Sequence, residues 1–372
     1  MNAVLLGYGT VGKGVEILCK NRSDLQLKQV FVRPNKTKLP YFSSDGVAMV
    51  TDSEVDIVFE CLSGIEPANT LITLALEHGK HVITSNKAVV SYNLERYCQL
   101  AQRYNGSIQI EACVAGGIPF LDAILKLSQL EDIRGYEGIF NGTSNYILDQ
   151  LQKHDISFDE ALKKAQDLGY AEADPANDIE GMDVFYKANI SNMLAFQTYS
   201  NTLHSPIGIT KITKEDIHLA KEYKKVIRHI AVSNQKGNEY ATVIAPAFLP
   251  EDHFLASVHD NYNAQFIYAD SFDKLGYYGQ GAGQLATAQA MLANAIDTLS
   301  GRERAILLHH KKTNTPELLN FDWIIRTEKN IQDAFEVEPL KDSYYICKNK
   351  NILYIDEMMK FDENALVALW RS

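Results

Sequence analysis

The chain has few cysteines, and their spacing excludes two classes of protein. Its 372 residues include five cysteines, an odd number, and none of them form a Cys-x-x-Cys pair. This pattern is typical of reduced thiols and argues against a disulfide framework or a zinc site. We therefore expect a cytoplasmic protein. The five are Cys19, Cys61, Cys98, Cys113 and Cys347.

Positive charge and long apolar runs are also scarce. Lys and Arg number 36 against 47 Asp and Glu, which gives a net charge of −11. This balance argues against nucleic acid or an anionic membrane surface as a partner, but it places no limit on a small-molecule substrate. No stretch approaches the roughly 20 apolar residues that a membrane span needs. The apolar strand expected at the very start leaves no room for a signal peptide.

The first 120 residues alternate apolar strands with amphipathic helices. This alternation predicts a parallel, Rossmann-type sheet with helices on both faces, which binds ligands beyond the carboxyl ends of its strands. The expected strands are 3–6, 26–32, 55–61, 81–84 and 107–113, and the expected helices are 11–20, 67–78 and 90–104.

The rest of the chain predicts a second α+β domain for substrate binding and dimerisation, followed by a small C-terminal α+β appendage, within an overall α/β class. We expect the domains to be 1–125, 126–283 and 301–372, with the helix 284–300 returning to the first. The last domain is either regulatory or an oligomerisation appendage. Expected elements include strands at 128–140, 239–254, 321–327, 343–348 and 351–356, and helices at 144–153, 158–168, 181–199, 214–234 and 363–370.

A glycine-rich turn joins the first strand to the first helix. Gly7, Gly9 and Gly12 fit the dinucleotide fingerprint, in which the glycines permit a tight turn, a close approach to the pyrophosphate and close helix packing. The pyrophosphate would lie on the helix N-terminus. Thr10 and Val11 complete this candidate cofactor site.

The second strand is followed by basic residues where a ribose-binding acid is usual. Arg33 and Lys36 could bind a 2′-phosphate, so NADP is favoured over NAD; the alternative is a solvated basic loop. Polar residues also follow the later strands, at Ser63, Ser85 and Asn86. Lys87, beside them, could stabilise an oxyanion or bind a carboxylate.

An acidic loop precedes an almost uncharged helix that contains Asp183 and Lys187. Their i,i+4 spacing places both on one helix face, and a buried pair of this kind indicates catalysis or substrate binding more than a surface ion pair. Glu172, Asp174 and Asp178 in the loop could bind a substrate ammonium group; a solvated acidic surface is the alternative. Glu111, in an apolar strand, could bind a cation with nearby backbone carbonyls; a partly exposed strand end is the alternative.

Over roughly residues 1 to 300 the chain resembles the homoserine dehydrogenase family. The resemblance lies in six ordered motifs: Gly7–Gly12, Thr84–Ala88, Glu111–Pro119, Asn141–Leu148, Gly169–Lys187 and Gly279–Gly283. It implies NAD(P)-dependent interconversion of L-aspartate 4-semialdehyde and L-homoserine, in threonine and methionine biosynthesis, by a homodimer or a larger homo-oligomer.

The resemblance also implies roles for individual residues. Lys187 would be the proton donor with Asp183 beside it, and Lys87 would contact both cofactor and substrate. Glu172 and Asp178 would lie on the substrate side, and Gly283 near the nicotinamide. A monovalent cation such as Na⁺ would bind Glu111, Val114, Gly116 and Ile118.

The chain departs from the family pattern at Asn177, at Leu285–Thr287 and at Asn294. Longer relatives end in a threonine-sensing ACT domain, whose β-α-β-β-α-β order is not clear in the C-terminal region here. The alternative function is a catalytically weak NADP-binding sensor, against which the joint presence of Lys87, Glu172, Asp183 and Lys187 argues. A related dehydrogenase for another amino-acid aldehyde is a third hypothesis.

Overall fold

The computed structural model describes residues 1–36, 39–199, 203–308 and 311–372, which form two compact units. Of the described residues, unit 1 comprises those within 1–130, 189–200 and 280–310, and unit 2 comprises those within 131–188, 201–279 and 311–372. No helix in the described ranges is both long and apolar enough to cross a membrane.

Unit 1 is built on a six-stranded sheet in which every strand pairing is parallel. The strand order is β3-β2-β1-β4-β5-β6, the order of a dinucleotide-binding fold, with its switch point between β1 and β4. This confirms the predicted Rossmann-type sheet. The strands are β1 (Asn2–Leu6), β2 (Gln26–Phe31), β3 (Phe42–Ser43), β4 (Ile57–Glu60), β5 (His81–Thr84) and β6 (Ser107–Gln109).

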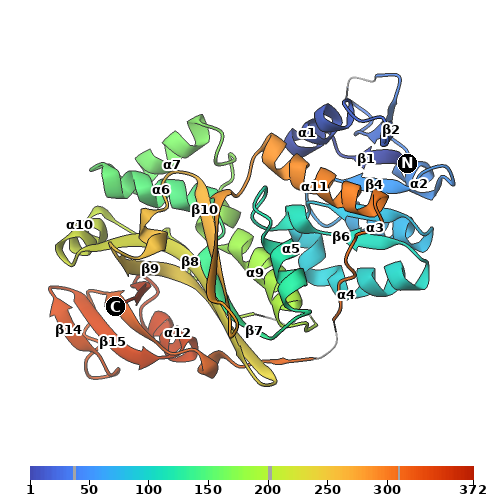
Figure 1. Ribbon diagram of the computed structural model, residues 1–372. Coiled ribbons are helices and arrows are strands. Elements are labelled where there is room, and N and C mark those ends of the chain that lie inside the picture. The colour runs from blue at the N-terminus through green and yellow to red at the C-terminus, as the bar shows by residue number, and fades with distance from the viewer. Residues whose placement is uncertain (37–38, 200–202, 309–310) are drawn as a thin grey trace. The chain divides into compact units, whose positions relative to one another are not determined.

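Helices flank this sheet because its central strands are apolar on both sides. Every residue of β4 is buried, for example, as are the last four of β1. α1 packs along α11 (Figure 1), and Gly14 makes this possible, since a Cβ there would lie 2.5 Å from the carbonyl oxygen of Gln284. The helices are α1 (Thr10–Cys19), α2 (Gly46–Thr51), α3 (Ala68–Glu77), α4 (Lys87–Arg103), η1 (Glu111–Cys113), α5 (Phe120–Leu127) and α11 (Gln284–Leu299).

Unit 2 contains a ten-stranded mixed sheet in the order β11-β10-β7-β8-β9-β16-β13-β15-β14, with β12 beside β9. Alternate residues of its strands enter two different apolar clusters: Trp323 and Ile325 join one, and Ile324 between them joins the other. The strands are β7 (Ile133–Ile139), β8 (Lys225–Lys236), β9 (Glu239–Pro250), β10 (Tyr262–Ala269), β11 (Asp273–Gln280), β12 (Thr313–Asn314), β13 (Phe321–Arg326), β14 (Glu338–Lys341), β15 (Tyr344–Lys350) and β16 (Leu366–Trp370).

The helices of unit 2 include those that contain the candidate catalytic residues. α6 and α7 pack together, and α6 also packs on β8. α9 begins in unit 2, and its residues from Asn189 onward are assigned to unit 1. The helices are α6 (Gly142–Lys153), α7 (Phe158–Asp167), α8 (Ala176–Ile179), α9 (Met182–Ala195), α10 (Lys214–Glu222), η2 (Phe254–Ser257), η3 (Pro316–Leu318) and α12 (Ile352–Phe361).

Four of the predicted elements are wrong in type or length. The strand expected at 107–113 ends at Gln109, so Glu111 lies in η1 and not in a strand. The helix expected at 214–234 ends at Glu222, and β8 begins at Lys225 after Lys224 turns the chain at a φ of +53°. The strand expected at 351–356 is α12, which Asn351 caps and which buries Ile352, Ile355 and Met358 along one side. The helix expected at 363–370 is β16, a short apolar strand between β9 and β13, and periodicity cannot distinguish such a strand from a buried helix.

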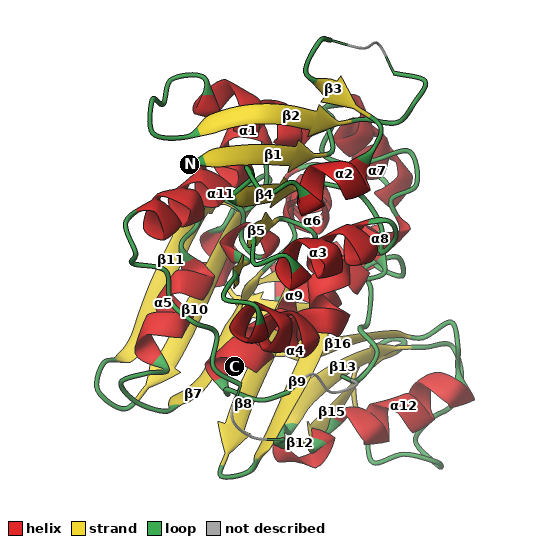
Figure 2. Ribbon diagram, turned by 90° about the vertical axis from the view of Figure 1, so that its right-hand side faces the viewer, coloured by secondary structure: helices red, strands yellow, loops and turns green. Residues whose placement is uncertain are grey.

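The C-terminal strands continue the sheet of unit 2, because β16 pairs in parallel with β9 (Figure 2). Within this region the strand order is β16-β13-β15-β14, with antiparallel pairing and α12 between β15 and β16. This is the order of a β-α-β-β-α-β unit without its first helix, since residues 327–337, all described, form only turns and loop.

Candidate functional site

The glycine-rich turn after β1 has the backbone that a dinucleotide site needs. Gly7 has a φ of +99°, and a Cβ there would lie 2.7 Å from the carbonyl oxygen of Cys61. A Cβ on Gly12 would lie 2.1 Å from the carbonyl oxygen of Gly7, so only glycine fits the closed turn. A Cβ on Gly9 meets no atom of the described chain within 4 Å, which leaves room at the start of α1 for a ligand.

A carboxylate that we did not single out in the sequence fixes Tyr8 of this turn. Tyr8 and Tyr41 both donate a hydroxyl hydrogen bond to Glu16 on α1, the second at 2.8 Å. The hydrogen bond to Glu16 raises the pKa of Tyr8 to about 12, so Tyr8 stays a donor. The turn, α1 and the segment before β3 are therefore joined through one buried side chain. Arg33 and Lys36 are exposed after β2, and residues 37–38 lie outside the described ranges.

The junctions after β4 and β5 are joined by a second carboxylate that sequence reasoning missed. Glu60 is fully buried. Its carboxylate accepts a hydrogen bond from the backbone N–H of Leu62 at 2.7 Å and another from the hydroxyl of Thr84. Burial raises the pKa of Glu60 to about 7. The backbone N–H of Asn86 donates to Thr84, and the Asn86 amide donates to the carbonyl of Gly64 at 2.8 Å. A charged residue inside an apolar strand was the available signal.

The side chain of Asn86 also accepts from Val89 and so caps α4, of which Lys87 is the first residue. Lys87 is half-buried, Ser85 is half-buried and Ser63 is exposed. The candidate cofactor residues thus lie at the carboxyl ends of neighbouring parallel strands, where such sheets bind ligands. Gly283, which precedes α11 in the same unit, has a φ of +130°, a backbone conformation that favours glycine.

Glu111 lies on η1, and its carboxylate contacts the N-terminus of α5. Its two carboxylate oxygens accept from the backbone N–H groups of Leu121 and Asp122, at 3.3 and 2.6 Å. Burial raises the pKa of Glu111 well above its usual range, and the nearby Asp122 adds to this shift. Ala115 and Gly116 have φ values of +59° and +55° in the following turn.

The ligand set expected around Glu111 is a carboxylate with backbone carbonyls. Of the three carbonyls, that of Ile118 accepts from Phe120 N at 2.8 Å. No group of three His, Cys, Asp or Glu side chains that could bind a metal ion exists among the described residues. The turn is therefore not a site for a metal that needs several such side chains.

Asp183 and Lys187 meet in unit 2 as their spacing predicts. The Lys187 ammonium donates to Asp183 Oδ2 at 2.6 Å and to the carbonyl oxygen of Phe140 at 2.6 Å. The two side chains are 6 % and 9 % exposed, so the pair is nearly removed from water. A buried pair of this kind costs desolvation energy, which a surface ion pair does not, and this favours a chemical role.

The acidic loop is only partly assembled around this pair. Asp178, on α8, is half-buried and accepts from the amide of Asn141 at 2.7 Å. Glu172 and Asn177 are exposed. Thr143 holds the loop to α6 by donating its hydroxyl to the carbonyl of Tyr170 at 2.6 Å.

A buried histidine lies beside the start of α9. His229 is 1 % exposed and its Nε2 lies 3.0 Å from the carbonyl oxygen of Ile207. Burial lowers the pKa of His229 to about 4, so the ring is neutral near pH 7. Gly181 passes so close that a Cβ there would lie 3.1 Å from this ring, which fixes the chain entering α9.

Comparison with known proteins identifies the family. The family model for homoserine dehydrogenase matches residues 119–296, and that for the NAD-binding domain of homoserine dehydrogenase matches residues 7–109. The chain is 34 % identical to a homoserine dehydrogenase of Lactococcus lactis over 314 aligned residues. These residues make up 80 % of this chain and 73 % of the relative. This chain belongs to the homoserine dehydrogenase family.

Two further homoserine dehydrogenases are similar to this chain over most of its length. The protein from Synechocystis is 37 % identical over 312 residues, which cover 79 % of this chain and 72 % of that one. The crystal structure of a homoserine dehydrogenase from Thiobacillus denitrificans matches with a TM-score of 0.88 at 26 % identity, over 100 % of this chain and 98 % of that one. As a family member the chain is an NAD(P)-dependent oxidoreductase.

Proposed function

We propose that this enzyme interconverts L-aspartate 4-semialdehyde and L-homoserine, with Lys187 as the proton donor and acceptor. The observation that carries the proposal is the buried Lys187–Asp183 pair, with 2.6 Å between its N and O atoms. When bound, the nicotinamide cofactor supplies or removes the hydride. Reduction of the aldehyde places negative charge on its oxygen, which a nearby ammonium group neutralises by giving up a proton.

The residues around Lys187 orient this proton. Two of the groups to which the Lys187 ammonium donates are fixed. They are the carbonyl of Phe140, directly after β7, and the carboxylate of Asp183, one helical turn before Lys187 on α9. An ammonium held in this way has a defined direction, which is how a general acid lowers a barrier. In the oxidative direction the same amine accepts the hydroxyl proton of homoserine.

Acidic residues of unit 2 would bind the other end of the substrate. Asp178 and Glu172 offer carboxylates to a substrate ammonium group, and Asp178 is held in place by Asn141. Lys87, in unit 1, would bind a substrate carboxylate or stabilise the oxyanion. We accordingly assign nucleotide binding to unit 1 and binding of the substrate ammonium group to unit 2.

We propose NADP as the preferred cofactor. Gly7, Gly9, Thr10, Val11 and Gly12 would hold the pyrophosphate, with Ser63, Ser85, Asn86, Lys87 and Gly283 toward the nicotinamide. Arg33 and Lys36 support the preference, because both are exposed after β2 and no carboxylate stands between them. A 2′-phosphate would be bound by these two cations.

We further propose a monovalent cation such as Na⁺ at the turn after Glu111. The donors would be the Glu111 carboxylate and the carbonyls of Val114, Gly116 and Ile118, an all-oxygen set of the kind that hard cations prefer. This set fits, because each oxygen that already accepts one backbone N–H keeps a second lone pair.

Three further assignments complete the proposal: a homodimer or larger homo-oligomer, a cytoplasmic location, and a place in threonine and methionine biosynthesis. The location is supported by the five free thiols. Light scattering after size-exclusion chromatography would test the oligomeric state.

The decisive experiment is a steady-state assay that follows reduced nicotinamide with L-homoserine and either NADP or NAD, with threonine added in a parallel series. We expect turnover that is faster at low NADP than at low NAD. Cofactor binding without turnover would contradict the proposal and favour a sensor. Turnover with another amino-acid alcohol in preference to homoserine would correct the substrate.

A further inference from the structure

The catalytic pair is held by a side chain with no role in the chemistry proposed above. Asn141, 5 % exposed, directs one amide nitrogen at two carboxylates: Asp183 Oδ2 at 2.8 Å and Asp178 Oδ1 at 2.7 Å. The amide NH₂ has two hydrogens, so it can serve both carboxylates at once. Asn141 thereby joins the proton-transfer pair to the loop that would bind the substrate.

The orientation of the Asn141 amide follows from its partners. Its Oδ1 accepts from the backbone N–H of Ser144 at 2.7 Å, which caps the N-terminus of α6. Ser144 N–H can only donate and the ionised carboxylates can only accept, so the nitrogen must face Asp178 and Asp183. A single side chain thus caps α6 and contacts the carboxylates of both Asp178 and Asp183.

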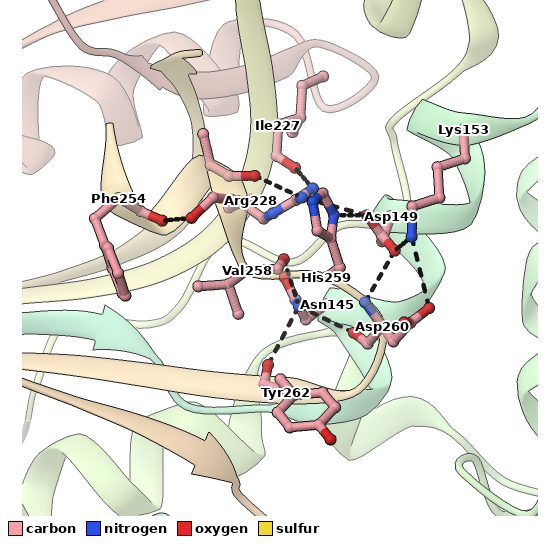
Figure 3. Close-up of polar contacts among 12 residues, drawn as sticks. Asn145, Asp149, Lys153, Ile227, Arg228, Phe254, Val258, His259, Asp260 and Tyr262 are labelled. Atoms are coloured by element: carbon pink, nitrogen blue, oxygen red, sulfur yellow. Dashed lines mark hydrogen bonds and ion pairs between the residues drawn. The ribbon is translucent and has the colours of Figure 1, made fainter. Parts of the chain in front are cut away.

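Asn141 begins a row of polar residues that repeats every four residues along α6. Asn145 follows at the next turn, then Asp149, then Lys153, and this spacing places them on one helix face. The Asn145 amide lies within hydrogen-bond distance of three carbonyl oxygens, those of Val258, Asp260 and Tyr262, at 3.2, 3.0 and 3.2 Å (Figure 3).

Asp149 fixes the same helix to the sheet and to the loop before β10. It is 1 % exposed and accepts from His259 Nδ1 and from the backbone N–H of Asp260, each at 2.9 Å, while Lys153 lies 2.7 Å away (Figure 3). Arg228, on β8, lies 3.4 Å from it. Burial by itself would raise the pKa of Asp149, but these partners lower it, so the carboxylate stays charged and bound.

We propose that Asn141 is a positioning residue for the proton-transfer step, and that the polar row of α6 keeps it in place. Asn141 does not exchange a proton itself. Its amide holds Asp183 against Lys187 and holds Asp178 at a fixed distance from that pair, while Asn145 and Asp149 keep α6 from shifting. This inference rests on the proposed function, because it assigns a purpose to the Lys187–Asp183 geometry.

Two substitutions at Asn141 separate positioning from helix capping. Asn141→Ser retains a side-chain acceptor for Ser144 but loses the amide donors, and Asn141→Asp retains the shape and the cap but places a third carboxylate beside two others. Asn, Ser and Asp cap helices about equally well. A purely capping role therefore predicts a wild-type kcat for Asn141→Ser, whereas positioning predicts a kcat order of wild type, then Ser, then Asp.

We expect kcat to fall by about 10-fold in Asn141→Ser and by about 100-fold or more in Asn141→Asp, with a higher KM for homoserine through Asp178. NADP affinity should stay within about twofold. The matched control is Asn351→Ser, the same exchange at the residue that caps α12 through Tyr354 N–H at 3.2 Å; it should keep kcat within about twofold of wild type.

A double-mutant cycle gives the second readout. If Asn141 acts through Asp183, Asn141→Ser should cost much less kcat in an Asp183→Asn background than in the wild type. Additive losses, or a kcat within twofold of wild type in both Asn141 variants, would overturn the inference. Losses of kcat that follow the thermal midpoint of each variant would overturn it too. A wild type that fails to turn over homoserine contradicts the proposed function instead.

Discussion

The two units present their proposed functional residues in opposite ways. In unit 1 the residues come from short contiguous segments, such as 7–12 and 85–87, at the ends of parallel strands. In unit 2 the Lys187 ammonium depends on Phe140, Asn141 and Asp183, which two segments, 140–141 and 183–187, bring together. Nucleotide binding uses backbone groups that a local motif can supply, whereas an oriented, buried proton donor requires packing between distant elements.

The strongest test of this comparison removes the buried ammonium. We expect Lys187→Ala to lower kcat by about 10³-fold while the Kd for NADP, a property of unit 1, stays unchanged. The control is Lys163→Ala, which breaks the Lys163–Asp167 pair with the same i,i+4 spacing and the same kind of contact at 2.7 Å on an exposed face. That control should retain full turnover. A Lys187→Ala enzyme with most of its kcat would remove Lys187 from the mechanism.

A second test concerns the buried carboxylate of unit 1. The raised pKa of Glu60, about 7 against 4.5, means that the folded state favours the neutral acid. Its contribution to stability is therefore complete below about pH 4.5 and disappears as the pH rises through about 7. The total is about 3 kcal/mol at about 1.4 kcal/mol per pKa unit.

Denaturant titrations between pH 5 and 8 measure this contribution. We expect the unfolding free energy of the wild type to fall relative to that of Glu60→Gln over this interval. Parallel curves for the two proteins would show that Glu60 does not titrate there.

The glycine turn offers a third test, in which alanine substitutions at Gly9 and Gly12 should have different effects on stability. Gly9→Ala places its Cβ in open space, so the thermal midpoint of the free enzyme should be unchanged while the Kd for NADP rises about 30-fold. Gly12→Ala places its Cβ 2.1 Å from an oxygen and should lower the midpoint as well. An equal fall of the thermal midpoint in both variants would contradict the placement of the pyrophosphate beside Gly9.

The fourth test sharpens the cofactor assignment. Arg33→Ala should raise the Kd for NADP by about 10-fold and leave the Kd for NAD almost unchanged, because only NADP carries the 2′-phosphate. Lys28→Ala removes the same charge from an exposed position on β2 and serves as the control. Equal losses for both cofactors would assign Arg33 to a general electrostatic effect.

The smallest expected effect concerns the cation. Replacing choline chloride with NaCl at equal ionic strength should raise the thermal midpoint of the wild type by about 2–4 °C, since a ligand that binds only the folded state stabilises it. Glu111→Gln, which keeps an oxygen toward α5 but loses the charge, should lose this difference. An Na⁺ effect of the same size in the variant would place the cation elsewhere.

The sequence by itself determined the β-α alternation of unit 1, the glycine turn and the i,i+4 pairing of Asp183 with Lys187, because each depends on residues close together in the chain. Its errors lie where tertiary packing overrides local preference: β16 is a strand only because β9 and β13 lie on either side of it. Glu60, Glu16 and Asn141 acquire their roles from partners up to 42 residues away. Only the folded structure decided those roles, since a hydrogen bond between distant segments leaves no periodic signal in the chain.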